Sequence, residues 1–198
     1  MSNGWEGRRE TRQYGNGWIS FDLPVLTNIT ITQALTAIRD SSIQDQCLDF
    51  GKVHLGPSGN PPRYLTALDH KTQIPLSPQL QEFYSFARWW RNSILLMEVI
   101  DPDAYFEHLT NPNLHLGEVL ANEFSHPYVL VDEDECAIDP ARCVLFSLDT
   151  LDRYPYNRVY LVFGDKEEPE VWGFREEHFH SPNLLAYLVN GVPHDGIL

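Results

Sequence analysis

The residues of this chain best suited to metal chemistry are two histidines that follow two glutamates. Glu176 and Glu177 precede His178, and Phe179 separates His178 from His180. Imidazole and carboxylate groups together suit zinc or a harder transition metal. An H-x-H pair places both rings on one face only within a strand, and this pair precedes a predicted helix start, which indicates a loop. We therefore expect a solvated connection and no metal or other cofactor, with a metal-dependent hydrolase as an alternative.

A run of four carboxylates, Asp132, Glu133, Asp134 and Glu135, is a second candidate site. It lacks the alternating oxygen ligands, central glycine and distal glutamate of an EF-hand calcium loop. Adjacent carboxylates repel one another unless solvent or a cation screens them, so a solvated turn is one interpretation. Contact with a basic protein surface is another, because such a patch attracts one partner and disfavours others. Cation binding is a third.

Motifs for nucleophilic or phosphate chemistry are absent from the sequence, which contains no G-x-S-x-G, Walker or G-x-G-x-x-G pattern. The three cysteines, Cys47, Cys136 and Cys143, are an odd number without C-x-x-C spacing. This argues against a disulfide framework and a zinc knuckle, and favours a reducing cytoplasm. Cys143 lies in an apolar segment, where thiols are usually inert. We therefore predict no catalytic residues.

Composition and charge restrict the class of protein and the kind of partner. The 198 residues are 42% hydrophobic, enough for one domain with a sizeable core. We expect residues 1–17 to form a flexible tail and residues 18–198 a single domain. The formal net charge of -14 argues against nucleic acid or an anionic membrane as direct partner, and no apolar run approaches the roughly 20 residues that span a bilayer. A basic protein is the natural complement, and an acidic surface that serves solubility alone is the alternative. The N-terminus lacks the apolar core of a signal peptide.

The elements that must position these residues are clearest near the C-terminus. Residues 159–163 form a short apolar run with both faces hydrophobic, which predicts a strand inside a sheet. An acidic turn at residues 164–169 and a second strand at 171–174 complete an antiparallel hairpin. Ser181-Pro182 is typical of a helix start, and the apolar spacing that follows predicts a helix to residue 190.

A second helix is predicted from residue 78 to 91. Its apolar residues recur at helical spacing and form an aromatic stripe: Leu80, Phe83, Tyr84, Ala87 and Trp90. Core packing is the favoured interpretation of this stripe, and a platform for stacking a ligand is the alternative.

The order of strand, acidic hairpin, strand ending in aromatics, loop and final apolar helix resembles the C-terminal half of the SUKH superfamily. That superfamily includes fungal cell-wall regulators and many bacterial toxin-immunity proteins. A second similar piece lies at Ile74-Pro75-Leu76-Ser77-Pro78, which introduces a helix with an aromatic pair. The resemblance implies an α+β fold and an immunity role, in which the domain covers the active site of a basic toxin. On that hypothesis the partner contacts are Asp132, Glu133, Asp134, Glu135, Glu167 and Glu168. A regulatory interaction scaffold is the alternative.

We expect a mostly antiparallel sheet of about five or six strands covered by helices, with Trp172 and Phe174 in or beside its core. Helices are predicted at 30–39, 78–91, 101–110 and 181–190. Strands are predicted at 18–23, 63–68, 128–131, 142–148, 159–163 and 171–174. Residues 93–100 suit either a helix continuation or a buried strand.

Overall fold

The computed structural model describes residues 10–14, 17–21, 29–44, 54–91, 98–105, 107, 128–131, 134–137, 139–148, 157–174 and 179–190. The chain divides into two compact units, Met1–Thr30 and Ile31–Leu198. The first unit contains β1 (Glu10–Tyr14) and β2 (Gly17–Phe21), which pair antiparallel. Strand β2 agrees with the strand predicted at 18–23, and β1 lies within the segment predicted as a tail.

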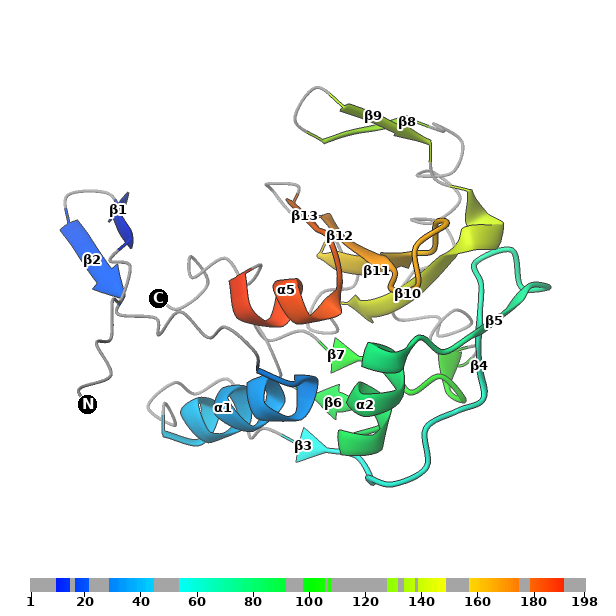
Figure 1. The fold of residues 1–198 in the computed structure, drawn as a ribbon, viewed down its shortest axis with the longest axis horizontal. Helices are drawn as coiled ribbons and strands as arrows, with labels where there is room; N and C mark the ends of the chain where they lie inside the picture. Colours follow the sequence, from blue (N-terminus) through cyan, green and yellow to red (C-terminus); the bar gives the residue numbers. More distant parts are fainter. Residues whose placement is uncertain are drawn as a thin grey trace, which may run out of the picture. The chain divides into compact units, whose positions relative to one another are not determined.

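The second unit is built on a seven-stranded sheet (Figure 1). Its strands, in chain order, are β3 (His54–Leu55), β6 (Trp90–Arg91), β7 (Glu98–Val99), β10 (Cys143–Leu148), β11 (Arg158–Val162), β12 (Glu170–Phe174) and β13 (Phe179–Ser181). Every neighbouring pair is antiparallel, and the order across the sheet is the order along the chain. The predicted α+β class is confirmed, with more strands in the main sheet than expected.

Two small hairpins interrupt this meander. Strands β4 (Tyr64–Thr66) and β5 (Gln73–Pro75) lie in the chain between β3 and β6. Strands β8 (Tyr128–Val131) and β9 (Asp134–Ala137) lie between β7 and β10. The strands predicted near β4, β8 and β10 are therefore present.

Strands β10 and β11 are buried over almost their whole length. All six residues of β10 are buried, and Arg158 to Leu161 of β11 are buried as well. Strand β11 pairs with β10 on one side and β12 on the other, which confirms its predicted interior position. The register shifts between Leu145 and Ser147, where Phe146 is the extra residue of a bulge. Trp172 is buried, as predicted, whereas the side chain of Phe174 lies outside the described residues.

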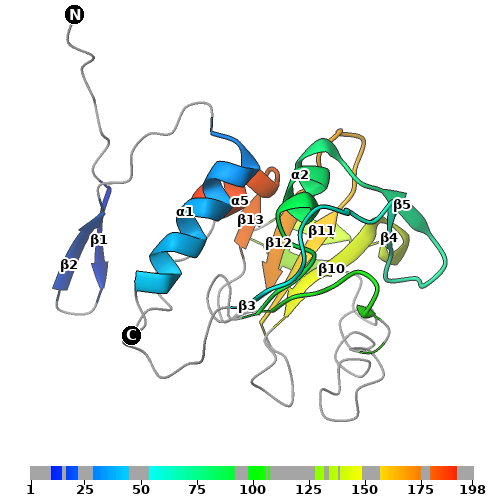
Figure 2. The ribbon, with the colours of Figure 1, turned by 90° about the horizontal axis from the view of Figure 1, so that it is seen from below.

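Three helices pack together beside the sheet: α1 (Ile31–Gln44), α2 (Pro78–Phe86) and α5 (Leu184–Asn190) (Figure 2). Helix α5 contacts β12 and β13, and the ring of Phe83 in α2 packs edge-on against Phe146, with centroids 5.1 Å apart. All five residues of the predicted aromatic stripe are at most 2% exposed. The core-packing interpretation of the stripe is therefore confirmed.

Helix α2 is shorter than predicted, ending at Phe86 rather than at residue 91. Ala87 still donates its N–H to Phe83 O, but its backbone is extended. Beyond it, Arg88 N donates to Pro57 O at 3.1 Å, and Gly56 N donates to Trp89 O at 2.9 Å. Backbone hydrogen bonds between residues 88–89 and the segment after β3 therefore take the place of the last predicted turn of α2.

Helix α5 begins at Leu184, later than the predicted start at Ser181. Ser181 is the last residue of β13 and pairs with Val171. The capping residue is Asn183, whose Oδ1 accepts a hydrogen bond from Ala186 N at 2.9 Å. The Ser181-Pro182 pattern therefore predicted the region in which the helix starts correctly, but it predicted the wrong capping residue.

At the end of the segment 93–100, Glu98–Val99 form β7, which favours a strand there; residues 93–97 lie outside the described residues. Of the helix predicted at 101–110, residues 101–105 and 107 are described, and the other residues lie outside the described ranges. Its start is a turn in which Ala104 N donates to Asp101 O at 2.9 Å.

Candidate functional site

The turn between β11 and β12 contains two of the residues predicted as partner contacts, Glu167 and Glu168. Its residues Gly164 to Glu167 are exposed, while the strands that flank it lie inside the sheet. The side chain of Asp165 is fully exposed and forms an ion pair with Arg142 Nη2 at 3.1 Å. Arg142 Nε also donates to Phe163 O at 2.8 Å. The turn is thus tied to the start of β10.

The two glutamates predicted as contacts in this turn have different surroundings. Glu167 is exposed and has no hydrogen bond or ion pair to any other described residue. Glu168 is partly buried: its Oε2 accepts from Ser77 Oγ at 2.6 Å, and its Oε1 accepts from Gln79 N at 3.0 Å. Glu168 therefore caps α2, and Glu167 is the carboxylate left facing solvent.

The acidic run Asp132 to Glu135 is only partly within the described residues. Asp134 and Glu135 begin β9, and Asp134 pairs with Val131 of β8. The run therefore does not lie wholly in a turn, because its second half belongs to a strand. Asp132 and Glu133 lie outside the described residues.

A second charged cluster surrounds Glu170 at the start of β12. Lys166 Nζ lies 2.6 Å from Glu170 Oε1, and His180 Nε2 lies 3.2 Å from Oε2. The hydrogen bond from Lys166 holds the pKa of the Glu170 carboxyl below its ordinary value of 4.5. Partial burial acts in the opposite direction and raises this pKa, whereas the charges of Lys166 and His180 lower it further. The imidazole of His180 packs on the indole of Trp172, with centroids 4.5 Å apart.

One prediction about the H-x-H pair, His178 and His180, was wrong. His180 lies in β13, not in a loop, and it pairs across the strands with Trp172. Glu176, Glu177 and His178 lie outside the described residues. Within the described part of the chain, no group of three or more histidine, cysteine, aspartate or glutamate side chains is arranged to hold a metal ion.

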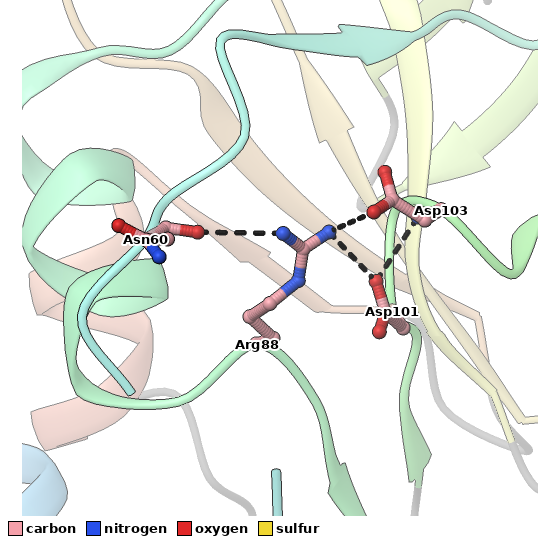
Figure 3. Close-up of polar contacts among 4 residues, drawn as sticks. All are labelled: Asn60, Arg88, Asp101 and Asp103. Atoms are coloured by element: carbon pink, nitrogen blue, oxygen red, sulfur yellow. Dashed lines mark hydrogen bonds and ion pairs between the residues drawn. The ribbon is translucent and has the colours of Figure 1, made fainter. Parts of the chain in front are cut away.

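A third cluster, which sequence reasoning missed, joins two loops through Arg88 (Figure 3). Arg88 Nη2 lies 3.1 Å from Asp101 Oδ1 and 2.6 Å from Asp103 Oδ2, and its Nη1 donates to Asn60 O at 3.4 Å. Asp101 Oδ1 also accepts from Asp103 N at 3.0 Å. The partly buried guanidinium therefore holds the loop before β4 against the turn after β7. The aspartates on either side of Pro102 were the only signal for this cluster in the sequence.

A void of about 10 Å³ lies near this cluster, lined by Leu65, Thr66, Tyr84, Ile100, Pro102, Tyr105, Val144 and Leu145. That volume is at the lower limit for one water molecule and far below that of a ligand pocket. Burial raises the pKa of the Tyr84 phenol above its ordinary value of 10, and Asp101 adds to this shift. Burial likewise raises the pKa of Tyr105. Both phenols are therefore neutral core groups at physiological pH.

Cys143 is a fully buried thiol in β10 that forms no disulfide. The side chains of Cys47 and Cys136 lie outside the described residues. No helix in the described ranges is long and apolar enough to cross a membrane.

Comparisons of the chain with known protein families, with curated proteins and with solved structures found no match.

Proposed function

We propose that this chain is a non-enzymatic binding domain that neutralises a basic toxin protein by covering its active site. The proposal rests on the resemblance of its C-terminal half to the SUKH immunity proteins. The domain acts stoichiometrically in the cytoplasm, in keeping with its odd number of cysteines. Its direct partner is a protein, not nucleic acid or membrane.

The observation that carries the proposal is the exposed Glu167 in the turn between β11 and β12. The other carboxylates of this region are engaged within the molecule: Asp165 by Arg142, Glu168 by the start of α2, and Glu170 by Lys166. A lysine or arginine of a partner meets Glu167 without displacing one of these contacts. Because both flanking strands are held in the sheet, little ordering of the backbone is needed on binding.

Long-range attraction comes from the charge of the whole chain. A formal net charge of -14 draws a basic protein toward this surface and raises the association rate. The run Asp132 to Glu135 is the other predicted contact, and it contributes four carboxylates to this charge.

The test is a pull-down from a lysate of the native host at low and moderate salt, with the retained proteins identified by mass spectrometry. We expect one basic protein to be held stoichiometrically, and more weakly at the higher salt because exposed charges are screened. Reversal of the four charges at residues 132–135, or Glu167→Lys alone, should slow association by roughly tenfold.

Glu107→Lys is the matched control, because Glu107 is exposed and its side chain has no polar contact within the described part of the chain. This variant changes the net charge as Glu167→Lys does, but outside the proposed surface. Equal weakening by both variants would show that net charge alone governs binding, and retention of no protein at either salt would refute the proposal.

Neutralisation is tested separately with the purified partner. Its toxic activity should fall to zero at a one-to-one ratio with this domain, because covering an active site requires one domain per toxin. A complex that forms while the partner remains fully active would favour the regulatory scaffold instead.

A further inference from the structure

The exposed turn between β11 and β12 is anchored at the start of α2 through Glu168. Its carboxylate bonds to Ser77 Oγ at 2.6 Å and to Gln79 N at 3.0 Å. Ser77 is the capping residue of α2 and is 6% exposed, and its Oγ also accepts from Leu80 N at 3.4 Å. Residues separated by about ninety positions in the sequence thus complete one helix cap.

The contact is favourable in three ways. The first N–H groups of a helix lack partners within the helix, and here Glu168 and Ser77 satisfy two of them. A carboxylate is also stabilised by the positive end of the helix dipole. Pro78 at the first helical position and buried Pro169 after Glu168 restrict the backbone on both sides of the contact.

The same helix start also reaches α5. Gln79 Oε1 accepts a hydrogen bond from Leu185 N at 2.9 Å, in the first turn of α5. The β11–β12 turn, α2 and α5 are therefore linked by hydrogen bonds of the side chains of Glu168, Ser77 and Gln79.

We infer that Ser77 and Glu168 are positioning residues for partner binding, which hold the turn in the conformation that presents Glu167. This inference rests on the proposed function, because it assigns these residues to the same binding surface. Neither residue needs to touch the partner: Ser77 is buried, and both oxygens of Glu168 are occupied. Their contribution to affinity is that the turn is ordered before the partner arrives.

The first experiment measures order in the free protein by ¹⁵N NMR relaxation, without any partner. In the native chain the amide of Glu167 should have an order parameter of ~0.85, typical of rigid backbone, and Ser77→Ala should lower it to below about 0.6. Glu168→Ala should give the same result, because it removes the same contact from the side of the turn. An unchanged order parameter in both variants would overturn the inference.

Ser85→Ala is the matched control. Ser85 lies in the same helix, is exposed, and donates its hydroxyl to Gln81 O at 2.6 Å rather than to the turn. This variant should leave the order parameter of Glu167 unchanged. A loss of order as large as that in Ser77→Ala would mean that any weakening of α2 loosens the turn, and would overturn the specific role of Ser77.

The second experiment measures the affinity of the same variants for the basic protein captured in the pull-down. Ser77→Ala should weaken binding about fivefold, because a smaller fraction of molecules then has the binding conformation, whereas Ser85→Ala should bind normally. If Glu167→Lys weakens binding and Ser77→Ala does not, the positioning role is wrong. If neither variant changes binding while the turn still loosens in Ser77→Ala, the turn is not the contact, and it is the proposed site that fails.

Discussion

At the scale of single residues, Gly56 is constrained by the indole ring of Trp89. A Cβ atom at Gly56 would lie 2.5 Å from Trp89 Nε1. The guanidinium carbon of Arg91 lies over the same ring, 5.3 Å from its centroid, and the Gly56 N–H donates to Trp89 O. Glycine at this position is therefore required by close packing against a side chain.

We expect Gly56→Ala to lower the free energy of unfolding by roughly 1–3 kcal/mol, because the added methyl group overpacks this contact. Gly164→Ala is the matched control, since a Cβ there meets no atom within 4 Å. The control should be neutral or stabilise the fold by about 0.4–1 kcal/mol, because alanine restricts the unfolded chain. Urea denaturation followed by tryptophan fluorescence distinguishes the two, and equal stability of both variants would contradict the packing argument.

The ion pair between Lys166 and Glu170 should make stability depend on pH at the acidic end. The pKa of Glu170 is lower in the folded state than its ordinary value of 4.5. The stability that ionised Glu170 contributes to the fold is therefore present above about pH 4.5. It is lost as the pH falls through the lower pKa that Glu170 has in the folded state. We expect Glu170→Gln to be less stable than the native chain by about 1 kcal/mol or less at neutral pH, and this difference to be smaller at an acidic pH well below 4.5.

Urea titrations of both proteins at the two pH values test this expectation. Glu167→Gln serves as the control, because Glu167 has no ion pair to another described residue, and it should match the native chain at both pH values. A difference for Glu170→Gln that persists at the acidic pH would mean that packing, and not charge, accounts for the effect.

At the scale of elements, side-chain caps decide where the helices begin. Asn183 is the cap of α5, and its Oδ1 accepts from Ala186 N. We expect Asn183→Ala to lower the free energy of unfolding by about 1 kcal/mol. Asn60→Ala is the control, since Asn60 is exposed and contributes only its backbone oxygen to the Arg88 cluster. Thermal unfolding of the two variants measures the difference, and a loss in Asn60→Ala as large as in Asn183→Ala would rule out the capping role.

The elements that sequence reasoning located well are those with a strong pattern within a few residues. The apolar run at β11 and the spacing of buried residues in α1 depend only on neighbours in the chain, and both appear where predicted. The end of α2 could not be predicted, because it depends on hydrogen bonds from Gly56 and Arg88 between distant segments. The anchoring of Glu168 was hidden for the same reason: its partner, Ser77, is remote in sequence.

At the scale of the whole molecule, excess negative charge opposes the compact state. The chain carries 28 acidic and 14 basic residues, and several of the basic residues are already engaged in ion pairs, among them Arg88, Arg91, Arg142 and Lys166. The remaining carboxylates repel one another over distances comparable with the Debye length, which is ≈10 Å at 0.1 M salt.

We therefore expect the melting temperature to rise as sodium chloride increases from about 0.01 M to about 0.15 M, because screening weakens this self-repulsion. Calorimetry at constant pH measures the change. Glu107→Lys should reduce the salt dependence slightly, because it lowers the net negative charge by two. A melting temperature that falls with added salt would mean that ion pairs outweigh the repulsion.

The sequential order of the main sheet also bears on how the chain is made. Strands β11, β12 and β13 leave the ribosome after the other described strands, yet β11 and β12 lie inside the sheet. Until they emerge, β10 is an unpaired edge whose six residues are all destined for burial. A nascent chain paused before residue 158 therefore exposes an aggregation-prone strand, and the hairpin that presents Glu167 is also the segment that protects the finished sheet.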